Sequence, residues 1–424
     1  MLKSTLSWVD FSEHDRDHML QVIRMFAEPE TVDELGIGSV RDALADVLFP
    51  GTSTIQTRAA YFLFIPWIYV SLEGRRASAR DVAELARRRE VQLIDALAAS
   101  DDTRGVIGIE ARSKLKRFPS SIYWNGLGVW GIRRFPGSRE QYHRSFASSP
   151  VGPGTVLTND DGEPADGVVR WNWHPALPDP PPGFPRRASF RLRPDDADFL
   201  QERIQSSAPN SYLAFLIGEG GIFSPETVLF PWQHPRTAHA PELNRRQLAH
   251  ARNFSLVMHG AALCYNLLLV EARLALRQTD ADEERRDTYV DMLEQWWAEV
   301  KAWTRVVQQW DMTSFWATAE QGNPNIHRRT RYFVETWLAF VREHLRGGHP
   351  VDRLVRSQRV VDLLKERERQ LKGSRARFYN PHALDGWNGR SGADRLNYRW
   401  PVVSDIVLDI LNGFAEGEFD AATG

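Results

Sequence analysis

The chain has 424 residues, of which 42% are hydrophobic and 25% charged, and its formal net charge at pH 7 is −2. This is ordinary globular composition, so we expect a buried core and two or three domains. The single cysteine, Cys264, excludes a disulfide framework and a cysteine-based zinc site within one chain.

The sequence also argues against a secreted, membrane-spanning or NTP-driven protein. The N-terminal residues lack the apolar stretch of a signal peptide, and no window approaches the ~18 uninterrupted apolar residues of a membrane span. The phosphate-binding loop GxxxxGK and the nucleophile elbow GxSxG are both absent. We therefore predict a cytoplasmic protein, and we assign it no catalytic residue, cofactor or metal.

The first 148 residues are predicted to form a helical domain. Apolar residues recur at helical spacing, serines stand where helices would begin, and prolines stand where they would end. Pro66, within a continuously apolar stretch, is expected to end a buried helix there. The expected helices cover residues 12–26, 39–48, 59–66 and 78–99.

A basic segment over residues 112–144 is the most informative feature of this domain. It holds eight Lys or Arg residues and one acid, Glu140, interleaved with aromatic residues. Basic groups pair with phosphates and aromatic faces stack on bases, so this composition is typical of a polyanion-binding surface. The residues expected to contact nucleic acid here are Arg112, Lys114, Lys116, Arg117, Tyr123, Arg133 and Arg134.

Two interpretations of this segment remain open. In a winged-helix or helix-turn-helix variant, residues 105–118 would form a second helix, and a third would begin at Ser120 or Ser121. The reading residues would then be Ser120, Ser121, Tyr123, Trp124 and Asn125. The glycines at 126, 128 and 131 instead favour a packed aromatic platform with a basic rim. Such a platform would bind the nucleic-acid backbone without reading its sequence.

Residues 149–187 are predicted to be a connector, because prolines and glycines are dense there. Trp171 and Trp173 within it indicate that the connector is held against a surface. The remaining residues, 188–424, are predicted to form a C-terminal helical bundle. Its expected helices cover residues 195–204, 245–277, 281–309, 327–345 and 351–371.

A second basic segment lies in this C-terminal part, between Leu364 and Trp400. A turn after a helix carries three basic residues that we expect to contact phosphates: Lys372, Arg375 and Arg377. Two other features leave alternatives open. Asp291 and Glu299 could imitate a metal-dependent nuclease core. The acidic, tryptophan-rich stretch over residues 280–316 could dock a basic partner.

Three stretches also resemble a known group of sequences: GIGSVRDALADVLFPGTSTIQTRAAYFLFIPWIY, PSSIYWNGLGVWGI and LKGSRARFYNPHALDGWNGRSGADRLNYRW. They resemble an uncharacterised bacterial family of unknown function, over essentially the whole length. Members of that family look to sit beside helicase, methylase or nuclease genes in antiphage-defence clusters. The resemblance implies a role with nucleic acid in a multi-protein system, and it carries over no catalytic residue.

We therefore expect a mainly α protein that acts without catalysis as a nucleic-acid-binding or assembly subunit of an antiphage defence complex. Its expected partners are nucleic acid, with DNA favoured, and defence proteins such as a helicase or nuclease, but no membrane. A protein scaffold and a metal-dependent nuclease are the two alternatives.

Overall fold

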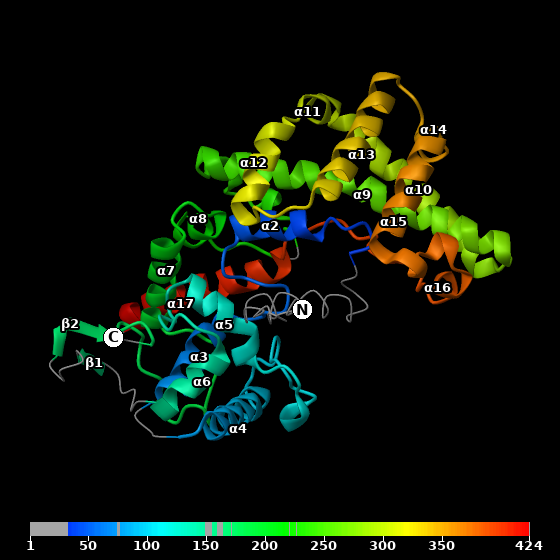
Figure 1. Cartoon of the computed structure of the whole chain (residues 1–424). Coiled ribbons are helices and arrows are strands. Elements are labelled where there is room, and N and C mark those ends of the chain that lie inside the picture. Colours follow the sequence, from blue (N-terminus) through cyan, green and yellow to red (C-terminus); the bar gives the residue numbers. More distant parts are fainter. Residues whose placement is uncertain are drawn as a thin grey trace, which may run out of the picture. The chain divides into compact units, whose positions relative to one another are not determined.

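The computed structural model describes residues 33–73, 77–148, 155–158, 164–170, 172–219, 221–225 and 227–423. The described chain is mainly α-helical, as predicted, with one two-stranded sheet (Figure 1). The helix expected over residues 12–26 lies outside the described residues.

The chain divides into two compact units, and each is assembled from separate stretches of sequence. Unit 1 holds residues 33–41 and Ala251–Leu396, and unit 2 holds Asp42–His250 and residues 397–423. This division differs from the three consecutive segments expected from the sequence. It arises because residues at both ends of the chain are bonded to partners hundreds of positions away.

Unit 2 is built on the apolar helix α3 (Tyr61–Val70), which is buried at every position from Tyr61 to Tyr69. This helix continues through Pro66, so the expected end at that proline is wrong. A proline removes one backbone hydrogen bond, and here the burial of the whole helix offsets that loss. Unit 2 also contains most of α2 (Gly38–Leu48), together with α4 (Ala79–Ala98), η1 (Arg112–Lys114), α5 (Pro119–Val129), α6 (Arg139–Ser148), α7 (Pro194–Ser207), α8 (Tyr212–Glu219), η2 (Pro231–Gln233), η3 (Thr237–His239) and α17 (Trp400–Thr423).

Helix α4 begins where the sequence predicts, because the Ser78 side chain accepts a hydrogen bond from the Asp81 backbone N–H at 3.2 Å. The second helix of the expected helix-turn-helix does not form. Residues 105–118 are turns with a single 3₁₀ segment, η1, and Gly105 and Gly108 have φ of +83° and +82°. These left-handed conformations interrupt a helix.

The predicted connector holds an antiparallel hairpin of β1 (Thr155–Thr158) and β2 (Pro164–Arg170), which was not expected. Thr155 pairs with Arg170 and Val156 with Val169. Beyond it, Trp173 is buried, and its indole N–H donates to the Tyr142 hydroxyl at 3.0 Å. The prediction that the connector is held down is confirmed at Trp173, whereas Trp171 lies outside the described residues.

Unit 1 is a set of helices around the 35-residue helix α9 (Glu242–Leu276), whose first residues belong to unit 2. Two tryptophans anchor neighbouring helices to it: Trp296 donates to the Leu256 carbonyl and Trp337 to the Val257 carbonyl, each at 2.8 Å. The long helices expected over 281–309 and 351–371 are each broken in two. The unit contains α10 (Asp280–Ala302), α11 (Thr304–Gln309), α12 (Met312–Gly322), α13 (Arg328–Arg346), α14 (Val351–Val355), α15 (Gln358–Lys372), η4 (Gly373–Arg375), η5 (Arg377–Tyr379) and α16 (Pro381–Asp385).

Helix α9 is the one helix in the described part of the chain that is long and apolar enough to cross a membrane. However, 89% of its most apolar window is buried inside the protein. Such burial is typical of the core helix of a soluble protein.

Candidate nucleic-acid interface

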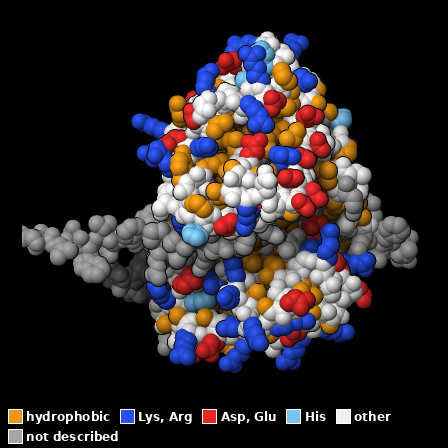
Figure 2. Space-filling model, turned by 90° about the vertical axis from the view of Figure 1, so that its right-hand side faces the viewer, with side chains coloured by type: hydrophobic (Ala, Val, Ile, Leu, Met, Phe, Trp, Pro, Cys, Tyr) orange, Lys and Arg blue, Asp and Glu red, His pale blue; other side chains and the backbone are white. Residues whose placement is uncertain are grey.

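Helix α4 and the segment around η1 together present a group of exposed basic side chains, which we call the basic platform. Arg87 links the two elements, because its guanidinium donates to the Ser113 carbonyl at 2.6 Å and lies over the Phe118 ring. Figure 2 shows Lys and Arg side chains gathered on the surface formed by unit 2, in the lower half of the view. The platform consists of Arg87, Arg88, Lys114, Lys116 and Arg117, all of which are exposed.

Arg112 and the acids of α4 form the border of the platform. Arg112 has φ of +47°, and its guanidinium donates to the Ile94 carbonyl at 3.0 Å and to Asp95 at 3.2 Å. Glu84 pairs with Arg80 and Arg88 at 3.4 and 3.6 Å. These pairs are exposed and contribute little to stability. Arg112 is thus partly occupied, whereas the two lysines of the platform extend into solvent.

Tyr123 is not available for base stacking, so its assignment as a contact residue is wrong. The side chain is fully buried in unit 2. Its hydroxyl donates to the Arg58 carbonyl at 3.0 Å and accepts from the backbone N–H groups of Thr57 and Arg58 at 2.8 and 3.1 Å. Ser120 and Trp124 are buried as well, so three of the five expected reading residues cannot reach a base, whereas Asn125 is exposed.

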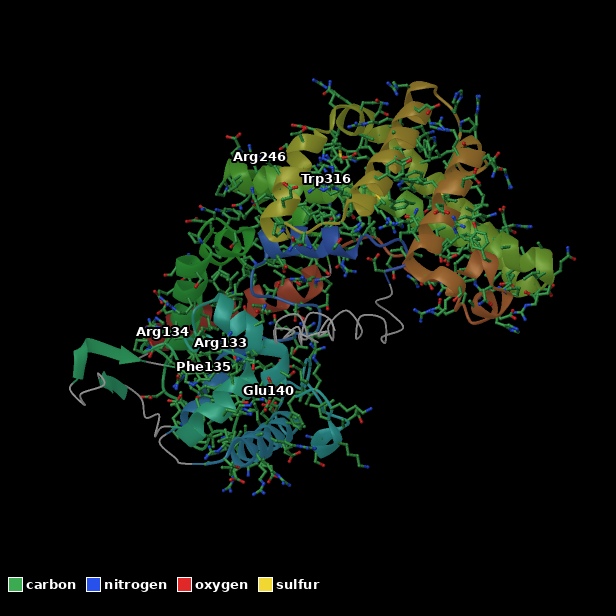
Figure 3. All side chains as sticks on the ribbon, in the orientation of Figure 1. Arg133, Arg134, Phe135, Glu140, Arg246 and Trp316 are labelled. Atoms are coloured by element: carbon green, nitrogen blue, oxygen red, sulfur yellow. The ribbon has the colours of Figure 1, made fainter. Side chains whose placement is uncertain are left out.

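The two arginines after α5 differ in how far their side chains are available to a ligand. Figure 3 labels both beside Phe135. The Arg133 guanidinium folds back and donates to the carbonyls of Trp124 and Gly137, each at 3.2 Å, and to that of Phe135. Its burial lowers the pKa of this guanidinium. Arg134 is exposed. Arg133 therefore serves the fold and Arg134 remains a candidate contact.

Two of the three residues proposed in the second basic segment are likewise occupied inside unit 1. Lys372 bonds to Glu34 and lies 3.0 Å from Glu368, while Arg377 donates to Glu34 at 2.7 Å. The Tyr265 hydroxyl donates to Glu368 at 2.5 Å within the same cluster. Only 16% of each basic side chain is exposed, so the assignment of Lys372 and Arg377 as phosphate contacts is wrong. Arg375 is exposed on the intervening turn.

A buried carboxyl that the sequence analysis missed fixes the position of α5 beside the platform. Glu90 on α4 accepts from the Ser120 backbone N–H at 2.8 Å and contacts the Ser120 hydroxyl at 2.8 Å. Arg139 on α6 donates to the same hydroxyl at 3.0 Å. Burial raises the pKa of Glu90 to about 7. The sequence does hold a sign of this buried carboxyl, because Glu90 lies on the apolar face of α4.

The structure also places the residues named for the two alternative functions. Asp291 and Glu299 are eight residues apart on α10, a rise of about 12 Å, which is too far for one shared metal ion. Glu299 accepts two bonds from Arg395, at 2.8 and 2.9 Å. Within the described residues, no group of three His, Cys, Asp or Glu could hold a metal. Of the tryptophans between 280 and 316, only Trp303 is exposed.

Residues 3–413 match the model of a family of unknown function, DUF6361. No curated protein and no solved structure matches the chain.

Proposed function

The chain belongs to DUF6361, a family of unknown function, and we propose that the protein binds the phosphate backbone of nucleic acid through the basic platform. The supporting observation is that Lys114, Lys116 and Arg117 are exposed within four residues of chain, beside Arg87 and Arg88 on α4. A cluster of basic side chains on one surface is the electrostatic footprint of a phosphate-binding protein.

The proposed contact is with the backbone and not with base edges. Sequence readout needs side chains that enter a groove from a helix or strand. In the segment after η1 the aromatic side chains Tyr123, Trp124 and Trp130 are buried, and α5 begins at Pro119 under a capping acid. The surface that remains for contact is the set of basic side chains of the platform. Binding should therefore be independent of base sequence and sensitive to salt.

We further propose that the protein is a cytoplasmic, non-catalytic subunit of a bacterial antiphage defence complex. The support is the family resemblance noted in the sequence. In this role the subunit would hold DNA, while a helicase or nuclease partner would supply the chemistry.

The proposal can be tested by fluorescence anisotropy with a labelled 30-base-pair duplex between 50 and 300 mM salt. We expect the logarithm of affinity to fall linearly with the logarithm of salt, with a slope of about −0.9 for each neutralised phosphate. The double variant Lys114→Glu, Lys116→Glu should weaken binding at least tenfold at 100 mM salt, because it replaces two attractive charges with two repulsive ones.

The matched control is Lys301→Glu, Arg305→Glu, which makes the same charge change at two exposed positions of α10 and α11 in unit 1. We expect this control to bind as the unaltered protein does. No binding at 50 mM salt, or equal losses in both double variants, would show that the platform is not the contact.

A further inference from the structure

Two tyrosines differ from the other eight of the chain in where they lie. Eight are buried, with exposed fractions of 3% or less, whereas Tyr332 is 68% and Tyr379 is 59% exposed. Both belong to unit 1. A largely exposed aromatic ring contributes little to a core and is accessible to a ligand.

Tyr332 stands on the outer face of α13 with basic neighbours. Arg328 and Arg329 precede it by four and three positions, so all three side chains share one helical face. Both arginines are exposed. The ring of Tyr332 thus stands one helical turn from two guanidinium groups.

Tyr379 ends the 3₁₀ segment η5 and also has a basic neighbour. The segment is held firmly, because the Phe378 backbone N–H donates to Glu368 at 3.2 Å and the Tyr379 N–H to the buried Ala376 at 3.1 Å. The exposed Arg375 lies four residues before Tyr379, on the turn that begins at Gly373. The anchored backbone therefore presents an exposed ring four residues after an exposed guanidinium.

Both tyrosines are carried by elements that pack on α15. The Arg367 guanidinium of α15 lies over the Phe333 ring of α13, and Lys365 lies over the Phe378 ring of η5. Arg359 of α15 also lies over the Phe340 ring of α13. These contacts hold both elements against α15.

We propose that Tyr332 and Tyr379 stack on unpaired bases, so that unit 1 binds single-stranded nucleic acid, with Arg328, Arg329 and Arg375 on its phosphates. Exposed aromatic rings beside basic groups are the arrangement used for single strands, because every base offers a face for stacking. A duplex offers no free base face except at its ends. The inference rests on the proposed nucleic-acid function and names the strandedness of its ligand.

The test uses the full chain and three labelled probes: a 20-nucleotide oligo-dT, a 20-nucleotide oligo-U and a 20-base-pair duplex. We expect Tyr332→Leu, Tyr379→Leu to bind both single strands about 30-fold more weakly, since each lost stack is worth about fivefold or more. Tyr332→Phe, Tyr379→Phe keeps both rings and should bind normally. Binding to the duplex should not change in either variant.

The outcomes separate this inference from the proposed function. If the leucine variant binds single strands normally while Lys114→Glu, Lys116→Glu weakens binding to the duplex, the inference is overturned and the proposed function stands. If no probe binds at 50 mM salt, both fail. Preference for oligo-dT or oligo-U identifies DNA or RNA as the source of the bases, and either preference supports the inference when the leucine variant abolishes it.

Discussion

Glu90 shows how one buried acid organises the surface that we propose as the contact. It is nearly inaccessible to solvent, yet it satisfies the first free N–H of α5 at Ser120 and, through the Ser120 hydroxyl, connects to Arg139. An acid at the N-terminus of a helix is favourable, but burial disfavours its charged form. Burial is the larger effect here, and the pKa of Glu90 rises to about 7.

We expect Glu90→Gln to become more stable than the unaltered protein as the pH rises. In the folded state Glu90 keeps its proton up to about pH 7, whereas in the unfolded chain it loses it near its ordinary pKa of 4.5. The stability that Glu90 contributes is therefore present below pH 4.5 and lost as the pH rises to 7. Chemical denaturation gives the unfolding free energy of the variant and of the unaltered protein at each pH. The difference between the two should change by about 2 kcal/mol from pH 5 to pH 8, in favour of the variant.

The buried His143 also makes the stability of the protein depend on pH. Burial lowers its pKa to about 4, so its contribution to stability has the opposite slope, rising between pH 4 and pH 6.5. This slope is the same in both proteins and cancels in the difference between them. A difference in unfolding free energy that is constant from pH 5 to pH 8 would contradict a raised pKa at Glu90.

At the scale of the element, helix α5 explains why the basic segment contains glycines. A Cβ on Gly126 would lie 2.3 Å from the Gly51 carbonyl oxygen, so the helix approaches the loop after α2 at backbone distance. A Cβ on Gly128 would instead meet the end of the Arg133 side chain at 2.3 Å. Gly126 therefore permits close packing against backbone, whereas Gly128 faces the end of a side chain, which can move more easily than backbone.

We expect Gly126→Ala to destabilise the protein by about 2 kcal/mol or more, because backbone atoms must move to admit the methyl group. Gly128→Ala should cost less, because Arg133 can shift and alanine favours the helix by about 1 kcal/mol. Thermal unfolding of the two variants would show the order. Equal melting temperatures would mean that α5 is not packed as closely as described.

The elements also show which parts of the fold and the site could be predicted from sequence. Helix α4 was predicted within one residue, because a serine cap and a regular apolar face are local signals. The continuation of α3 through Pro66 was not, since tertiary burial overrides the local signal of proline. Among the basic residues, Lys114 and Lys116 were predicted as exposed contacts and are exposed. Lys372 was misjudged although Glu368, four positions before it, is a local partner; its other partner, Glu34, lies 338 positions away, where no local pattern can indicate it.

At the scale of the whole molecule, the last helix, α17, is part of unit 2 although it follows unit 1 in the chain. It packs on α7 and α8. Its Asp409 accepts from the Arg58 guanidinium at 2.8 to 3.0 Å and from the Ala59 backbone N–H at 2.9 Å. Asp409 thus caps the start of the central helix α3 and neutralises a buried arginine.

We expect a chain that ends at Leu396 to lose the fold of unit 2 while unit 1 stays folded. Removing one partner of a buried ion pair costs about 3–5 kcal/mol, and the truncation also exposes the faces of α7 and α8 that α17 covers. Hydrogen–deuterium exchange should show lost protection in α3, α7 and α8 and retained protection in α10, α13 and α15. The single variant Asp409→Ala should show a weaker form of the same pattern. Full protection of α3 in the truncated chain would contradict the assignment of α17 to unit 2, whereas loss of protection in α13 and α15 would mean that the two units do not fold independently.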